Sequence, residues 1–240
     1  MRSVFISDLH LAESRPQATE RFCAFLEDGA RGAQALYILG DLFEYWVGDD
    51  DLSEPFNAIV AGLLQTLSKE GTGIWLMHGN RDFLLASAFC EAAGAELLAD
   101  PSIQDIGGQR TLLMHGDTLC TDDADYQNWR RTARSAAWQS GFLAKPLAER
   151  RREIEALREK SKEVIAAKPA DIMDVNEAEV QEAFRRHGVT RLVHGHTHRA
   201  GRHVLRVDGK PCERWVLPDW YGAGGYLVVE DSSARLVRFK

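Results

Sequence analysis

The sequence of 240 residues has few cysteines and no long apolar run. Its cysteines form no Cys-x-x-Cys pair, and a chain of this length can bury a core without disulfides. We therefore expect Cys23, Cys90, Cys120 and Cys212 to be structural thiols in a reduced, cytoplasmic protein. No stretch of 18 apolar residues occurs, and the start of the chain lacks the basic and long apolar regions of a signal peptide. Secretion and membrane spanning are both disfavoured.

Basic residues are fewer than acidic ones, and the formal net charge is −7 at pH 7. This balance argues against a nucleic-acid-binding protein, because such proteins are usually basic. Positive charge is nevertheless concentrated in residues 129–168, the basic block, where eleven Lys and Arg stand against five Glu. Such a block is typical of a solvated helix face, but on an acidic body it can also attract an anionic substrate or a phospholipid surface. The sequence leaves both interpretations open.

Short apolar runs alternate with segments of helical spacing in the first half of the chain, which predicts strands crossed by helices. The expected strands are 3–7, 35–39, 73–77, 111–114 and 191–193, and the expected helices are 17–29, 53–70 and one from about residue 81 to Gly94. Four further strand-like runs near the C-terminus, 203–207, 214–217, 226–230 and 236–239, predict an antiparallel segment. We therefore expect an α/β protein with mixed sheets.

The basic block interrupts this pattern between the fourth and fifth expected strands. Its apolar residues recur at helical intervals, so we expect a helical insertion there. Ser161 and Lys168 are two turns apart on that helix and share the side of Ile154 and Leu157 rather than the charged side.

Five polar motifs each follow one of the five apolar runs. They are Asp8-Leu9-His10, Gly40-Asp41-Leu42-Phe43-Glu44, Gly79-Asn80-Arg81-Asp82, His115-Gly116-Asp117 and Gly195-His196-Thr197-His198. One such motif is weak evidence, because an Asp often caps a turn and a His is often hydrogen-bonded in a loop. In α/β sheets, however, the loops after several strands converge on one ligand site. Five motifs in these positions predict a shared site.

The residue types in these motifs suit a pair of divalent cations. Two cations that share one water need about ten ligand positions, with at least one carboxylate able to bridge them. The candidate ligands are Asp8, His10, Asp41, Asn80, His115, His196 and His198. Because no thiolate belongs to the set, a structural zinc site is disfavoured, and manganese, iron or catalytic zinc remain.

In this order the five motifs resemble the calcineurin-like metallophosphoesterases, and the resemblance spans residues 8–198. It implies a β-sandwich of mixed sheets flanked by helices. It also implies two metal positions, one held by Asp8, His10, Asp41 and His198 and the other by Asp41, Asn80, His115 and His196. Asp41 would be the bridging ligand.

Arg81 departs from the commonest pattern of that family, in which many members carry a His that can protonate an alkoxide leaving group. A phosphate leaving group departs without a proton, so a fixed cation that spreads over developing charge is more useful. Arg81 therefore favours pyrophosphate cleavage, unless the side chain forms a structural ion pair.

Residues 40–46, 77–84 and 115–123, together with the insertion, are similar to the UDP-2,3-diacylglucosamine diphosphatase family of lipid A biosynthesis. That resemblance implies attack of metal-activated water on the α-phosphorus, with release of UMP and 2,3-diacylglucosamine 1-phosphate (lipid X). It implies two Mn²⁺ per chain and a peripheral enzyme on the cytoplasmic face of the bacterial inner membrane. Residues 1–120 and 171–240 would form the core, and 121–170 a cap whose apolar cleft takes the acyl chains. The cleft residues would be Trp129, Trp138, Phe142 and Leu143.

The same resemblance assigns roles within the site. Asn80, Arg81 and His196 would be catalytic, and the substrate contacts would be Asn80, Arg81, Asp123, Ser161, Lys168 and His196. Two alternatives remain: a generic nucleotide pyrophosphatase or phosphoesterase with the insertion as a simple lid, and a metal-stabilised scaffold without activity. We expect ordinary structural roles for His78, His187, His194, His203, Trp215, Trp220 and Tyr221.

Overall fold

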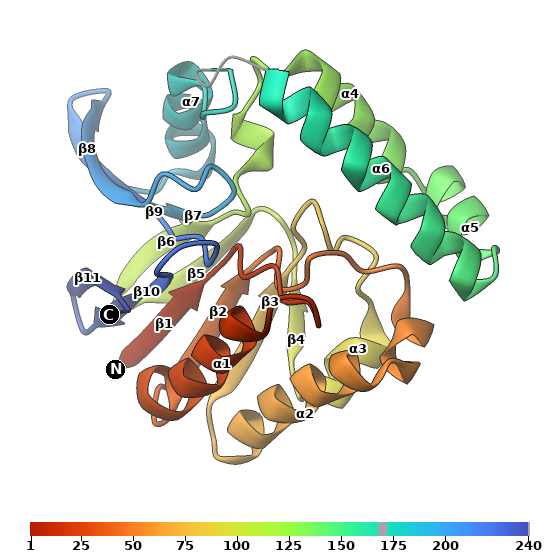
Figure 1. The fold of residues 1–240 in the computed structure, drawn as a ribbon. Coiled ribbons are helices and arrows are strands. Elements are labelled where there is room, and N and C mark those ends of the chain that lie inside the picture. The colour runs from red at the N-terminus through yellow and green to blue at the C-terminus, as the bar shows by residue number, and fades with distance from the viewer. Residues whose placement is uncertain (168–171, 240) are drawn as a thin grey trace.

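The computed structural model describes residues 1–167 and 172–239, which form two sheets with helices around them (Figure 1). The six-stranded sheet contains β1 (Arg2–Ile6), β2 (Ala35–Leu39), β3 (Gly73–Met77), β4 (Glu96–Leu98), β10 (Gly225–Glu230) and β11 (Ser233–Arg238), in the order β11-β10-β1-β2-β3-β4. The five-stranded sheet contains β5 (Ser102–Ile106), β6 (Gln109–Leu113), β7 (Arg191–His194), β8 (Gly201–Val207) and β9 (Lys210–Val216), in the order β5-β6-β7-β9-β8. Both sheets combine parallel and antiparallel pairs, which confirms the expected α/β sandwich of mixed sheets.

Helices pack on the outer faces of this sandwich. α1 (Pro16–Ala24), α2 (Pro55–Lys69) and α3 (Ser87–Ala93) cover the six-stranded sheet, and α7 (Glu177–His187) covers the five-stranded one. Three more helices, α4 (Ala124–Ala133), α5 (Ala136–Leu143) and α6 (Leu147–Ala167), lie together to one side (Figure 1). We call these three the helical group. No helix of the described residues is both long and apolar enough to cross a membrane.

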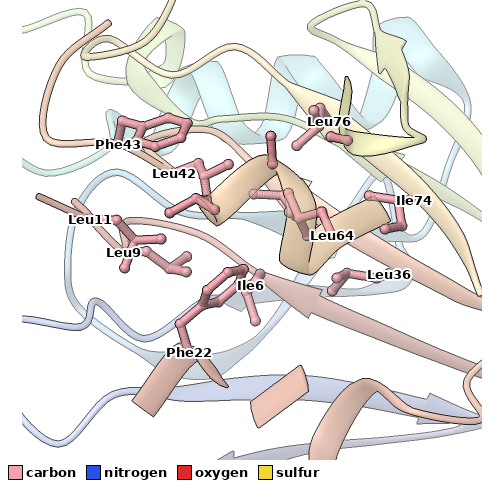
Figure 2. Close-up of a cluster of buried hydrophobic side chains, with 14 of the residues drawn as sticks. Ile6, Leu9, Leu11, Phe22, Leu36, Leu42, Phe43, Leu64, Ile74 and Leu76 are labelled. Carbon is pink, nitrogen blue, oxygen red and sulfur yellow. The ribbon is translucent and has the colours of Figure 1, made fainter. Parts of the chain in front are cut away.

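The core is built by alternation along the strands, because successive side chains of a strand point to opposite faces. On β1, Val4 and Ile6 face the helices, whereas Phe5 faces the second sheet. Figure 2 shows Ile6 and Leu36 packed with Leu64 of α2. On the second sheet, Leu113 points inward and its neighbour Leu112 packs toward α7. Each sheet is therefore buried on two faces in its central part.

One sequence expectation was wrong, and a second was correct only in part. The third helix begins at Ser87 rather than near residue 81, because the carboxylate of Asp82 accepts backbone hydrogen bonds from Gly79 and Leu42 and holds this segment in a turn. The C-terminal strands pair antiparallel, as expected, but they do not form one continuous segment. β8–β9 and β10–β11 are hairpins in different sheets, and β9 pairs in parallel with β7.

The helical group lies within the stretch expected to form the cap, and the division into core and cap stays a prediction. Ser161 is on α6 and is half-buried, whereas Lys168 lies outside the described residues. All four cysteines are free thiols, as expected.

Candidate metal centre

All seven candidate ligands follow the C-terminal ends of strands. Asp8 and His10 come after β1, Asp41 after β2, Asn80 after β3, His115 after β6, and His196 and His198 after β7. β1, β2 and β3 are mutually parallel, and so are β6 and β7, so these loops emerge at one edge of each sheet. The packing of the two sheets brings the two edges together.

Buried leucines and a phenylalanine fix the loops that carry the first ligands. Leu9 and Leu11 alternate with Asp8 and His10, and Figure 2 shows both leucines in the hydrophobic core. Leu11 also forms an isolated bridge with Phe43, and its backbone N–H donates to the carbonyl of Leu42 (2.9 Å). The apolar side chains of these loops, which cannot bind a metal, therefore hold the ligand residues in place.

Two groups of potential ligand atoms result. Asp8, His10 and His198 form one group, and Asp8, Asp41 and His115 form the other; within each group the atoms lie within 4.8 Å of one another. The two oxygens of Asp41 face different histidines, with Oδ2 3.8 Å from His10 Nε2 and Oδ1 3.9 Å from His115 Nε2. This placement suits a bridging carboxylate, and Asp8 is common to both groups.

Asn80 joins the remaining histidine to the second group. Its Oδ1 lies 3.0 Å from His115 Nε2 and 2.9 Å from His196 Nδ1. The backbone N–H of His196 also donates to Asp8 Oδ2 at 2.9 Å. The structure thus brings all seven predicted ligands into one constellation.

The backbone at these positions is unusual. Asp8, His10, Asp41, His196 and His198 have φ angles of 55°, 51°, 55°, 67° and 56°. Among described residues other than glycine, Asp208 and Asp231 are the further examples of positive φ. Such conformations cost free energy and occur preferentially at functional sites, where the surrounding structure enforces them. Their concentration here is independent support for a functional centre.

The donor set fits divalent cations. Asp8 Oδ1 and both ring nitrogens of His10 are buried and have no hydrogen-bond partner among the described residues. Burial holds the pKa of His10 well below its usual range, so the ring is neutral and can donate a lone pair. Burial, together with the carboxylates of Asp82 and Asp8, raises the pKa of Asp41 to about 7. A site that crowds carboxylates and imidazoles in this way is suited to bound cations.

A buried carboxylate links the centre to α4. Asp117 Oδ2 accepts hydrogen bonds from Tyr126 Oη and Arg130 Nε, both at 2.7 Å. Arg134 of the next turn donates to the carbonyl of Gly79, one residue before Asn80 (2.8 Å). Burial would raise the pKa of Asp117, but His115, His196 and Arg130 together lower it below its usual range. Sequence reasoning included Asp117 in a motif and missed these partners, because they lie on the separate helix α4.

A second link runs from α6. Arg158 forms an ion pair with Glu44, whose Oε2 lies 3.6 Å from His10 Nδ1. Glu44 also accepts a hydrogen bond from the hydroxyl of Tyr221 at 3.1 Å. The fourth motif residue after Gly40 therefore connects α6 and the C-terminal region to a candidate metal ligand.

The basic block pairs largely with carboxylates of the rest of the chain. Arg130 and Arg134 approach Asp117, Arg150 pairs with Asp50, Arg151 with Asp51 and Glu54, and Arg158 with Glu44. These pairs attach the helical group to an acidic body. Much of the positive charge counted in the sequence is therefore neutralised within the protein.

The predicted substrate residues surround the centre to different extents. Arg81 is half-buried, and its backbone N–H donates to Asp41 Oδ1 (2.8 Å). Its guanidinium forms no ion pair with any described carboxylate, so the described structure offers no support for a structural ion pair. Asp123 caps α4 by accepting from the backbone N–H of Tyr126 (3.1 Å). A cavity of about 280 Å³ lies between α5 and α6, lined by Trp138 and Phe142 together with the charged Lys145 and Glu153.

Comparison with known proteins decides the family. The family model for calcineurin-like phosphoesterases matches residues 1–200, which include every candidate ligand. The chain belongs to the calcineurin-like phosphoesterase family. It is 51% identical to a UDP-2,3-diacylglucosamine hydrolase of Aromatoleum aromaticum, over 95% of this chain and 92% of that protein. Proteins of the same name from Pseudomonas paraeruginosa and Cellvibrio japonicus are 47% and 48% identical, covering 100% and 98% of this chain and 99% and 96% of theirs.

In this calcineurin-like phosphoesterase, most of the residues for which we expected a structural role are hydrogen-bonded or buried. His78 Nε2 lies 2.6 Å from the carbonyl of Leu85, and Trp215 and Trp220 are buried. Tyr221 is different. It is 50% exposed, and its ring packs on that of His10 with the centroids 4.8 Å apart, so the packing residue that we expected has a candidate metal ligand as its partner.

Proposed function

We propose that the protein hydrolyses the pyrophosphate bond of UDP-2,3-diacylglucosamine, giving UMP and 2,3-diacylglucosamine 1-phosphate (lipid X) in lipid A biosynthesis. The observation that carries the proposal is that two groups of potential metal ligands share Asp8, while the two oxygens of Asp41 face one histidine of each group. The names of relatives about half identical over nearly the whole chain support the choice of substrate.

The centre would hold two Mn²⁺ ions through the seven candidate ligands. Bound there, the ions would supply Lewis acidity and lower the pKa of a water molecule from about 15.7 toward neutrality for attack on the α-phosphorus. The residues of this chain set the positions. Asp41 presents one oxygen to each side of the centre, and Asn80 and His196 lie together on the second side.

Arg81 would stabilise the negative charge that develops on the phosphoryl oxygens. Its main chain is fixed to Asp41, and its guanidinium is without a described carboxylate partner, so its charge is available to an anionic substrate. A cation that is already in place when the charge develops would need no reorganisation during the reaction. Asn80 and His196 would contact the same phosphate, while Asp123, Ser161 and Lys168 would bind the substrate from the insertion.

The helical group would bind the acyl chains as a cap over the core, with its limits at 121–170. The cavity between α5 and α6 and the exposed apolar side chains of Trp129 and Leu143 support this assignment. Since the acylated substrate resides in a bilayer, the enzyme would act as a peripheral protein at the cytoplasmic face of the inner membrane. Each free basic residue near anionic lipid contributes roughly 1 kcal/mol to such association. Binding to anionic vesicles that weakens with salt would agree with this location, and salt-insensitive binding would contradict the electrostatic part.

The first experiment is UMP release by metal-stripped protein in detergent, with and without added Mn²⁺. UDP-2,3-diacylglucosamine and UDP-glucose serve as parallel substrates. We expect Mn²⁺-dependent release from the acylated substrate alone. Equal release from both substrates would reduce the function to a generic nucleotide pyrophosphatase, and no release from either would favour the phosphoesterase or scaffold alternatives.

Arg81→Ala tests the role of the guanidinium. We expect kcat to fall by about 100-fold with a smaller change in KM, because the interaction strengthens only as charge develops. Arg186→Ala, on the outer side of α7, is the matched control and should leave both constants unchanged. A change confined to KM would contradict a role in the transition state.

A further inference from the structure

We propose that Arg15 and Tyr221 are positioning residues that hold the imidazole of His10 in the orientation required for metal binding. The inference rests on the proposed dinuclear centre and extends it to two residues outside the five motifs. It also explains why a half-exposed tyrosine lies directly against a buried histidine.

Tyr221 constrains His10 in two ways. Its ring stacks on the imidazole, with centroids 4.8 Å apart and an angle of 28° between the planes. Its hydroxyl donates to Glu44 Oε2, the oxygen that lies 3.6 Å from His10 Nδ1. One side chain thus contacts the face of the imidazole and fixes the carboxylate beside its edge.

Arg15 fixes the two backbone segments that carry His10 and Tyr221. Its Nη1 donates to the carbonyls of Leu9 (3.0 Å) and His10 (2.7 Å), and its Nη2 donates to the carbonyl of Trp220 (3.1 Å). The guanidinium carbon also lies 4.2 Å from the centre of the Tyr221 ring, in a cation–π arrangement. The left-handed conformation of His10 (φ 51°) is therefore braced by a direct hydrogen bond to its own carbonyl.

Trp220 makes this arrangement rigid although Tyr221 itself is half-exposed. The indole of Trp220 is fully buried, and its Nε1 donates to the carbonyl of Gly225 at 3.1 Å. Its backbone N–H donates to the carbonyl of Asp8 at 3.0 Å. Tyr221 is thus anchored through its neighbour to the loop that carries Asp8 and His10.

The orientation of His10 needs such support. Neither ring nitrogen has a hydrogen-bond partner among the described residues, so no hydrogen bond there sets the rotation of the imidazole. Stacking by Tyr221, the nearby Glu44 carboxylate and the carbonyl contacts of Arg15 supply the constraint instead. Residues that orient a metal ligand in this way affect metal affinity without touching the ion.

The test is equilibrium Mn²⁺ binding to metal-stripped protein, followed by the electron paramagnetic resonance signal of free Mn²⁺. Wild type should bind two ions. Tyr221→Leu and Arg15→Met should each weaken the binding of one ion by roughly tenfold and leave the other unchanged. Tyr221→Phe keeps the ring and should retain most of the affinity. Activity of the weakened variants should recover as Mn²⁺ is raised.

Arg21→Met is the matched control, because Arg21 donates to the carbonyl of Gly222 in the same segment (2.6 Å) but makes no described contact with His10. It should bind both ions as wild type does. Wild-type affinity in Tyr221→Leu and Arg15→Met would overturn the inference while leaving the metal centre intact. Absence of Mn²⁺ binding by wild type would overturn the centre and the inference together. Thermal unfolding of the metal-free variants separates loss of affinity from loss of fold, and Arg15→Met carries the test if Tyr221→Leu does not fold.

Discussion

At the scale of single residues, the centre depends on close approach between loops. A Cβ atom at Gly79 would overlap Oδ1 and the backbone nitrogen of Asp41, and one at Gly195 would overlap Asp8 Oδ2. Glycine at these two places allows the loops after β3 and β7 to touch the carboxylates that follow β1 and β2. Gly79 and Gly195 belong to two of the five motifs, and the structure shows which carboxylates they accommodate.

Gly79→Ala should therefore destabilise the protein, by about 2 kcal/mol in the free energy of unfolding, because the added methyl group must displace Asp41 or its backbone. Gly62→Ala is the control. Gly62 lies in α2, and nothing lies within 4 Å of the position that an added methyl group would take, so alanine should stabilise the helix by about 0.5–1 kcal/mol. Urea unfolding of both variants provides the comparison, and equal stabilities would contradict the steric argument.

At the scale of secondary-structure elements, charge attaches the helical group to the core. α4 contributes Arg130 to the fully buried Asp117, and the first part of α6 contributes Arg151 to the buried Asp51 at 2.5 Å. Ion pairs of this kind orient the helical group on the core. Removing one partner leaves a buried carboxylate without a compensating charge. The basic block is thus explained in large part by contacts within the chain, which leaves fewer free charges for a membrane.

Arg130→Met should lower the free energy of unfolding by about 3 kcal/mol, because it removes the guanidinium that donates directly to the buried Asp117 carboxylate, and Arg134 is more distant. Arg131→Met on the same helix should change stability by less than about 0.5 kcal/mol, because Arg131 is exposed and, among the described residues, bonds only to Asn128 of its own helix. Chemical denaturation measures both. A destabilisation shared by the two variants would point to α4 packing instead of the buried carboxylate.

At the scale of the whole molecule, stability depends on pH through buried histidines. His194 Nε2 lies 3.0 Å from the Arg214 guanidinium, which can only donate, so this nitrogen accepts and Nδ1–H donates to the carbonyl of Gly195 (2.8 Å). Burial, followed by the charge of Arg214, lowers the pKa of His194 to about 3. The neutral ring is therefore part of the folded state.

Because the pKa of His194 is lowered in the folded protein, its contribution to stability is lost at acidic pH. The unfolded chain takes up a proton at His194 below about pH 6.5 while the folded protein does not, so the stabilisation is complete above that pH and is lost as pH falls toward 3. Metal-free wild type should lose about 1 kcal/mol more stability between pH 7.5 and 5.5 than His194→Gln does. His187→Gln, at the end of α7, should follow wild type. Parallel pH dependence in wild type and His194→Gln would exclude this role.

Much of the fold and of the candidate site could be predicted from local patterns. Short apolar runs placed β2 and β3 at their observed limits, because a strand buried on two faces is marked by apolar residues that are neighbours in sequence. The motifs named all seven residues that the structure gathers, since each motif lies at the end of its own strand. The limits of α3 were predicted less well, because the turn before it is held by Asp82, whose partners Gly79 and Leu42 belong to two different loops.

The sequence by itself determined the residue types of the centre, their order after the strands and the charge difference between the insertion and the rest. Only the tertiary structure decided which of these side chains meet. Tyr221 reaches His10, Arg15 joins Leu9 to Trp220, and Arg158 reaches Glu44 across large separations in sequence. The physical reason is that orientation of a ligand depends on contacts from several elements at once, and no pattern within one segment carries that information.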